Sequence, residues 1–318
     1  MIRFMRHLTL IAALLASSSA MASFDLVMVA DRGTKSVHRF DGNTGLYLGS
    51  FGAGFLQNPM SMALDQANNR VFVADQVGAG TGAGSVQVRI WSFNYNTGSY
   101  LNSFSTAFTY INPQIAYQPT SNRVFVGHDG GIADSYSAAS GSFGPGINWL
   151  APQSALATAE NGDVWAANGT IVQRFSGSTA NYTMASPVSN TSGLGQRQMA
   201  ISNGRILTAG GTSFSTFSTT LSTTAANSLT TTATSYSQLS GAAFGHGNLA
   251  YITGSKTTTT GAISRILYNE RLVLSEFGGG VLQEPRSMVV VVAPEPGSMI
   301  ALGAGLVALL RKRKISKS

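Results

Sequence analysis

The sequence predicts an all-β fold: a six-bladed β-propeller closed by pairing of its N- and C-terminal strands, followed by a short C-terminal transmembrane helix. Three observations predict it. Groups of short strands and tight turns recur along the chain, one twelve-residue pattern occurs twice, and the sequence ends in an uncharged stretch with a basic cluster. We therefore divide the 318 residues into a signal peptide at 1–22, a propeller domain at 23–293 and a tail at 294–318.

The first segment has the three parts of a secretion signal. Arg3 and Arg6 precede a short apolar run, and small residues follow it, with Ala20 and Ala22 in an Ala-x-Ala arrangement. Basic, apolar and small-residue parts in this order are typical of a signal peptide. We expect signal peptidase to cut after Ala22 and the mature protein to be exported. The alternative is an uncleaved membrane helix.

The formal net charge of +7 comes from the two ends of the chain. Seven of the 20 Lys and Arg residues lie there: Arg3, Arg6, Arg311, Lys312, Arg313, Lys314 and Lys317. The body between them is close to neutral, which argues against nucleic-acid binding, because that function needs a basic surface on the folded domain. The sequence has no cysteine, so disulfides and thiolate metal sites are excluded.

A recurring unit follows the pattern FGAGFLQNPMSM at 51–62, which returns as FGGGVLQEPRSM at 277–288. Beyond the first copy come a short alternating strand, a polar turn and a β-rich strand at 70–74. Two more strands lie on either side of the turn at 96–98. Weaker copies of the first two strands occur at 111–129, 151–169, 196–211 and 237–254. Four short antiparallel strands in roughly 40–50 residues are typical of a propeller blade.

The two ends of the body predict how the ring closes. The stretch FDLVMVAD at 24–31 resembles the second strand of the unit but has no first strand before it. The stretch PRSMVVVVA at 285–293 resembles a first strand but has no second strand after it. We expect the two to pair in one blade, which leaves no open sheet edge there. A β-sandwich or a β-solenoid is the alternative, although neither explains a divided unit.

One copy of the unit also resembles a known repeat family. The stretch GAGFLQNPMSMALDQANNRVFVAD is similar to the NHL and YVTN-like propeller repeats, and Gly54, Pro59, Ala63, Asp65 and Asp75 fit their pattern. The later copies diverge, so the resemblance is strong for one blade and diffuse over the body. It implies a six-bladed propeller and leaves the activity open, because fold does not determine function.

Three acidic residues, Asp31, Asp75 and Asp129, lie at or just past the end of a second strand. They could form a ring of metal ligands, or each could hydrogen-bond nearby backbone N–H groups where its strand ends. The other three blades carry uncharged residues near this place: Asn168, Gly211 and Gly254. The pattern therefore favours turn-forming aspartates over a metal site.

Histidine is sparse after the signal segment, with His38, His128 and His246 in three different blades. They lack the close spacing of metal-binding pairs, so we expect turn or surface histidines and predict no catalytic, cofactor-binding or metal-binding residue. The pair His128-Asp129 is the one adjacent combination that merits a test. Six-bladed lyases and lactonases bind metals in the central channel, so an exported enzyme of that type is the alternative.

The tail has three parts in order: Pro294-Glu295-Pro296, fourteen uncharged residues at 297–310, and the basic cluster at 311–314. As a helix the uncharged run would be about 21 Å long at about 1.5 Å per residue, short of the roughly 30 Å hydrocarbon core. The basic cluster would hold its far end on the cytoplasmic side. This arrangement resembles a PEP-CTERM sorting signal, and the alternative is a simple membrane anchor.

The resemblance implies recognition by an exosortase, cleavage near the motif and delivery to the cell surface or exopolysaccharide matrix of a Gram-negative bacterium. Together with the propeller, it predicts an exported, non-catalytic binding protein with polysaccharide or protein partners and no cofactor. The Ser/Thr-rich stretch at 212–235 is either a modified surface or a weak blade.

Overall fold

A computed structural model gives the fold of the body. It describes twelve segments: residues 24–78, 86–109, 112–127, 132–148, 155–167, 172–176, 183–188, 196–211, 213–219, 231–232, 236–270 and 272–292. Within these segments the regular structure is β-strand, apart from a single 3-10 turn, η1 (Gln66–Asn68). The signal peptide and the tail, including its expected transmembrane helix, lie outside them. Among the described helices, none combines the length and apolar character that crossing a membrane requires.

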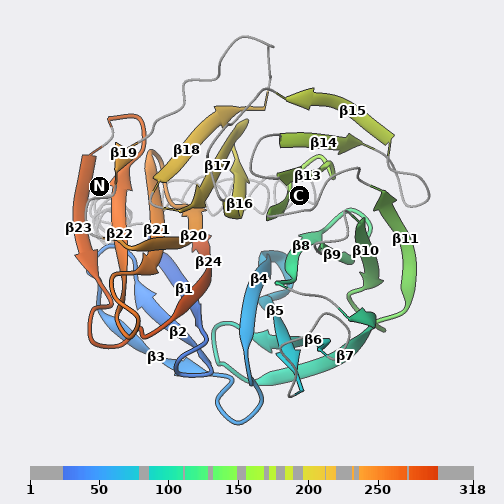
Figure 1. The fold of residues 1–318 in the computed structure, drawn as a ribbon, viewed down its shortest axis with the longest axis horizontal. Coiled ribbons are helices and arrows are strands. Elements are labelled where there is room, and N and C mark those ends of the chain that lie inside the picture. The colour runs from blue at the N-terminus through green and yellow to red at the C-terminus, as the bar shows by residue number, and fades with distance from the viewer. Residues whose placement is uncertain are drawn as a thin grey trace, which may run out of the picture.

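The described strands form six four-stranded antiparallel sheets arranged in a ring (Figure 1), here called blades 1 to 6. Blade 1 contains β24 (Pro285–Val292), β1 (Asp25–Asp31), β2 (Ser36–Asp41) and β3 (Tyr47–Phe51). Blade 2 contains β4 (Pro59–Asp65), β5 (Arg70–Val77), β6 (Gln87–Asn94) and β7 (Tyr100–Thr109). Blade 3 contains β8 (Gln114–Gln118), β9 (Arg123–Gly127), β10 (Ile132–Ser137) and β11 (Phe143–Asn148).

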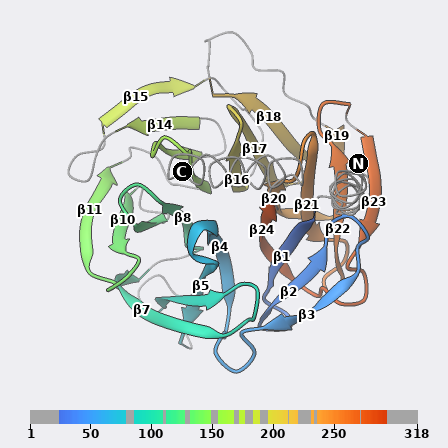
Figure 2. The ribbon, with the colours of Figure 1, turned by 180° about the vertical axis from the view of Figure 1, so that it is seen from behind.

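Blade 4 contains β12 (Ala155–Thr158), β13 (Val164–Ala167), β14 (Val172–Ser176) and β15 (Thr183–Val188). Blade 5 contains β16 (Gln196–Ser202), β17 (Arg205–Gly210), β18 (Ser213–Ser218) and β19 (Thr231–Thr232). Blade 6 contains β20 (Gln238–Phe244), β21 (Leu249–Ser255), β22 (Gly261–Leu267) and β23 (Leu272–Phe277). Figure 2 shows the same ring from behind, with strands such as β3, β7 and β11 along its perimeter.

Blade 1 is built from both ends of the body, so the predicted closure is confirmed. Strand β24 pairs antiparallel with β1, in a register that runs from Asp25 opposite Val292 to Ala30 opposite Ser287. Both strands are largely buried. Because β24 precedes β1 in the order of the sheet, the last described strand supplies the first strand of the first blade.

The innermost strands of the ring (Figure 1) are β24, β4, β8, β12, β16 and β20, and their side chains line a central channel. The serine of the twelve-residue pattern connects neighbouring blades here. Ser287 Oγ accepts a hydrogen bond from the backbone N–H of Met62 (3.0 Å), and Ser61 Oγ accepts one from Ile115 (3.1 Å). Further along the same pair of strands, the Gln66 amide donates to the carbonyl oxygen of Val292 (2.9 Å), so β24 and β4 run in the same direction and end at the same channel mouth.

The leucine of the same pattern packs in the loop that leads into β4 and in the loop that leads into β24. Leu56 and Leu282 are both buried, and each donates its backbone N–H to the carbonyl of the glycine four residues earlier, Gly52 or Gly278. The two copies therefore fold alike, although they lie at opposite ends of the sequence. The repetition reflects one loop structure used twice.

In blades 1, 2 and 3 a glycine turn packs against the preceding blade of the ring. In blade 2, Gly98 has a φ of +75° and lies against Phe51 of blade 1, where an added Cβ would come within 2.7 Å of the Phe51 Cβ. A larger residue would clash there as well as strain the backbone. Two other turns repeat the arrangement: Gly45 against Phe277 and Gly141 against Phe104.

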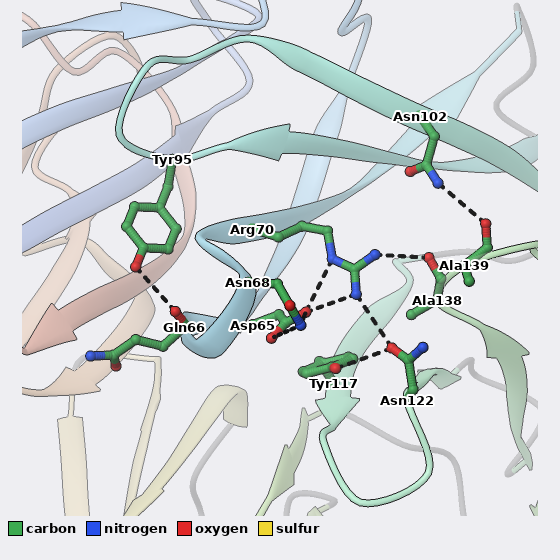
Figure 3. Close-up of polar contacts among 10 residues, drawn as sticks. All are labelled: Asp65, Gln66, Asn68, Arg70, Tyr95, Asn102, Tyr117, Asn122, Ala138 and Ala139. Carbon is green, nitrogen blue, oxygen red and sulfur yellow. Dashed lines mark hydrogen bonds and ion pairs between the residues drawn. The ribbon is translucent and has the colours of Figure 1, made fainter.

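Arg70 joins blades 2 and 3 through polar contacts (Figure 3). It forms an ion pair with buried Asp65 (2.7 Å) and donates to the carbonyl oxygen of Ala138 in blade 3 (3.1 Å). Its guanidinium also lies over the Phe72 ring, 4.5 Å from the centroid. Asn122 of blade 3 accepts from both Arg70 (3.3 Å) and Tyr117 (3.1 Å), so the interface is hydrogen-bonded as well as packed.

Removing the closing strand should destabilise the body far more than removing the tail. Deletion of 282–293 takes away β24 and opens a sheet edge, whereas deletion of 295–318 leaves every described strand intact. We expect the first deletion to lower the melting temperature by at least about 10 °C, since each kcal/mol shifts it by roughly 2–4 °C in a domain of this size. Circular dichroism melting compares the two, and equal melting temperatures would contradict closure through β24.

Candidate functional site: the channel mouth

The central channel contains a cavity of about 590 Å³ lined by the inner strands of all six blades. This volume is within the roughly 300–1,000 Å³ range of ligand pockets. Its described lining combines apolar side chains with amides and hydroxyls, and carries one carboxylate, Glu160, and one imidazole, His246. Such a surface can hydrogen-bond an uncharged polar ligand.

Polar residues gather at one mouth of this channel because of where the inner strands end. Gln66, Glu160, Asn203 and His246 each lie just past the end of an inner strand, in blades 2, 4, 5 and 6 respectively. Since neighbouring inner strands run in the same direction, these side chains share one end of the channel. We call this set the mouth residues.

A second hollow of about 300 Å³ lies between blades 4 and 5 and opens onto the same mouth. It shares part of its lining with the channel: Glu160, Ile201, Ser202 and Asn203. Asp163 and Arg174 form an ion pair in it (3.8 Å), and the Arg174 guanidinium lies 5.9 Å from the Trp165 ring centroid. Trp165 Nε1 is buried and has no hydrogen-bond acceptor among the described residues, whereas Arg174 Nε is the atom that faces the Asp163 carboxylate.

Buried Asp25 positions the turn that carries His246. The Asp25 carboxylate accepts hydrogen bonds from the Tyr251 hydroxyl (2.9 Å) and from the backbone N–H of His246 (3.0 Å). Burial raises the pKa of Tyr251 well above its usual value, and the nearby Asp25 charge raises it further. Asp25 thereby ties blade 1 to blade 6. Its one sequence signal is a single charge at the start of an apolar strand.

Gln198 connects two blades that are separated in the ring by blade 6. Its side-chain amide donates to the carbonyl oxygen of Met288 (2.5 Å) and accepts from the Met288 N–H (2.8 Å). Gln198 belongs to blade 5 and Met288 to blade 1, with Gly241 of blade 6 beneath the amide. A Cβ at Gly241 would come within 3.0 Å of the Gln198 Oε1, so glycine leaves room for this bridge. No sequence motif indicated it.

The strand-end aspartates serve the fold. Asp31 accepts from the backbone N–H groups of Thr34 (3.1 Å) and Gln283 (2.6 Å). Asp75 accepts from the Asn58 N–H (2.6 Å) and from Trp91 Nε1 (3.1 Å), and burial raises its pKa even though these hydrogen bonds oppose the rise. The turn interpretation is confirmed for Asp31, whereas Asp75 lies within β5 and binds the backbone of the loop before β4. Asp129 and His128 lie outside the described residues.

The histidine prediction was wrong for His38. It lies within β2 and is only 5% exposed, instead of occupying a turn or the surface. Its Nε2 is 2.7 Å from Thr34 Oγ1, and its Nδ1 is 3.3 Å from the Tyr47 hydroxyl. Polar neighbours on its own blade satisfy the ring, so the position accepts a histidine in a buried strand.

His246 does lie in a turn, beside the mouth. Within the part of the chain that the structure describes, no three His, Asp or Glu side chains come together as a group that could hold a metal ion.

The comparison with protein families identifies the end of the chain. Residues 292–314 match the PEP-CTERM protein-sorting motif. The predicted sorting signal is therefore confirmed, and the match includes Pro294, Glu295 and Pro296 and the basic cluster at 311–314. The PEP-CTERM motif implies an exported protein that an exosortase processes and sorts to the membrane or surface of a Gram-negative bacterium. The roles of individual tail residues, and of Ala20 and Ala22, lie outside the described residues and stay predictions.

The comparison with solved structures supports the architecture of the body. A chain from a crystal structure of a nidogen/laminin complex superposes with a TM-score of 0.64 at 8% identity, covering 85% of this chain and 98% of that one. At this identity the likeness shows a shared propeller fold and nothing about ligands. No curated protein matches the sequence. The finer assignment to NHL or YVTN-like repeats stays a prediction.

Burial of His38 should make stability depend on pH. Desolvation lowers the pKa of His38 below its ordinary value of 6.5, although the Asp31 charge opposes this. The folded state therefore takes up this proton less readily than the unfolded state. The stability that neutral His38 contributes to the folded state is present in full above pH 6.5. It is lost as the pH falls toward the lower pKa that His38 has in the folded state. Urea unfolding at pH 7.5 and pH 5 should show a smaller loss of stability for His38→Gln than for wild type, and equal losses would contradict this assignment.

Proposed function

We propose that this is an exported, exosortase-sorted, non-catalytic propeller displayed at the cell surface or in the exopolysaccharide matrix, where it binds polysaccharide or protein. The single observation that carries the proposal is the PEP-CTERM motif at 292–314. The exosortase and signal peptidase act on the two ends of the chain, and the folded body performs the binding.

The mouth and the adjoining hollow favour polysaccharide as the ligand. Sugars offer many hydroxyl groups that both donate and accept, and the hollow offers the partly exposed guanidinium of Arg174 as a donor and the carboxylates of Glu160 and Asp163 as acceptors. Amide and hydroxyl side chains dominate the remaining polar lining of the channel. The combination suits a neutral, hydroxyl-rich chain better than a highly charged one.

The second candidate is an exported enzyme of lyase or lactonase type that uses the channel. The observation in its favour is that Glu160 and His246 line the same cavity, since a carboxylate and an imidazole are the usual partners in acid–base chemistry. The two candidates differ in what happens to a bound polysaccharide, because an enzyme would change it.

A binding and product assay separates the two candidates. For the binding protein, Glu160→Gln should weaken retention of matrix polysaccharide about tenfold, equivalent to about 1.4 kcal/mol, and wild type should leave the chain length unchanged. Glu270→Gln, in an exposed turn outside the cavity, serves as the matched control and should bind normally. Shortened or chemically altered sugar produced by wild type but not by Glu160→Gln would establish the enzyme instead.

Two tail variants should fail in different ways. Replacing Pro294, Glu295 and Pro296 with alanine should leave the protein intact in the inner membrane, because the apolar run and basic cluster still hold it. Replacing the basic residues at 311–314 with serine should let unprocessed protein escape, since a segment of about 21 Å lacks the roughly 20 residues that normally span the membrane and loses its cytoplasmic anchor.

Cell fractionation with blotting for intact and clipped protein distinguishes these outcomes. Wild type should appear clipped and outside the inner membrane. An alanine variant that is still clipped and reaches the surface at the normal rate would contradict the sorting proposal.

A further inference from the structure

Strand β24 brings the chain to the mouth of the channel at the point where the sorting motif begins. Met288, Val290 and Val292 of this strand line the cavity. At its end, the side-chain amide of Gln66, a mouth residue of blade 2, donates to the carbonyl oxygen of Val292 (2.9 Å). The match to the sorting motif starts at this same Val292.

Blade 6 contacts the end of β24 from the side opposite blade 2. Asp25 is the register partner of Val292, and its carboxylate binds the Tyr251 hydroxyl and the N–H of His246. The end of β24 therefore lies beside turns of blade 2 and blade 6 at once. Its position relative to the mouth residues is fixed by hydrogen bonds on both sides.

Chain geometry limits the distance between the end of β24 and the uncharged run of the tail. Consecutive Cα atoms are about 3.8 Å apart, so Pro294 lies within about 8 Å of Val292, and the uncharged run that starts at Gly297 lies within about 19 Å. The radius of gyration of a folded body of this length is about 18 Å. The connection between the body and the uncharged run is thus comparable in length to the radius of gyration of the body. A connection this short limits rotation of the body relative to the membrane.

The other end of the chain leads to the same place. The predicted signal segment at 1–22 ends three residues before Asp25, which lies opposite Val292 in the sheet. Until signal peptidase cuts, both segments expected to engage the membrane therefore join the body at one edge, beside the channel mouth; afterwards the tail alone does so. The opposite end of the channel, where β4 and β24 begin, lies a full strand length away.

We propose that the face carrying the mouth residues is turned toward the membrane while the tail is attached, and that removal of the tail exposes the channel mouth to large ligands. This inference rests on the proposed sorting through the tail. It concerns an interaction surface: the face formed by the turns that follow β4, β12, β16 and β20 meets the lipid surface.

Single-cysteine labelling tests the orientation cleanly, because the natural sequence contains no cysteine. Strand β21 offers a matched pair of exposed positions: Asn248 precedes it at the mouth end, and Thr258 follows it at the opposite end. Asn248→Cys and Thr258→Cys are introduced separately into the full chain in which Pro294, Glu295 and Pro296 are alanine, so that the tail remains. Spheroplasts are then treated with a bulky, membrane-impermeant maleimide.

The expected result is that the Asn248→Cys variant reacts severalfold more slowly than the Thr258→Cys variant in membrane-held protein. After unfolding in urea the two variants should react equally. When the same substitutions are made with the natural sorting motif, protein recovered after processing should react at similar rates at both positions. Equal labelling of both positions in membrane-held protein would overturn the orientation while leaving the sorting proposal intact. If fractionation instead finds the alanine variant outside the membrane, the sorting proposal fails and the orientation fails with it.

Discussion

The pairing of β1 with β24 is the constraint on which the rest of the structure depends. It joins the two ends of the body in blade 1 and thereby converts a row of sheets into a ring. The ring forces six inner strands to surround a channel, and this produces both the cavity and its polar mouth. Hydrogen bonds from Gln283 to Asp31 and from Met62 to Ser287 extend the same closure to neighbouring loops and blades. The candidate binding surface is therefore a product of closure more than of any single blade.

Features that depend on local pattern could be predicted from the sequence. Alternating strands, turns and the repeated twelve-residue pattern give the antiparallel blades, and the unmatched strands at 24–31 and 285–293 give the closure. The strand-end position of Asp31 indicated backbone hydrogen bonding in the following turn, which the structure confirms. The tail could be recognised because its three parts adjoin in the sequence. In each case the signal itself is a short, continuous stretch of residues.

Features that depend on how strands pair within a blade and how blades pack together could not be predicted. Asp25 reaches Tyr251, and Gln198 reaches Met288, over distances in sequence that no spacing rule covers. The burial of His38 could not be predicted, because its hydrogen-bond partners, Thr34 and Tyr47, carry no sequence signal that they contact it. The sheet brings the three side chains together. The hollow around Trp165 likewise forms from two blades, neither of which carries a signal for it alone. One sequence records such contacts only as isolated polar residues in apolar strands.

The divided blade also has a consequence for the order of events during secretion. Contacts such as Asp31 with Gln283 join residues 252 positions apart, and non-local contacts of this kind make folding slow. A chain that crosses a membrane from its N-terminus delivers β24 last, so blade 1 stays incomplete until almost the whole body has been translocated. Completion of the ring therefore comes at the end of translocation of the body. The strand that finishes the fold directly precedes the sorting motif, whose match begins at Val292.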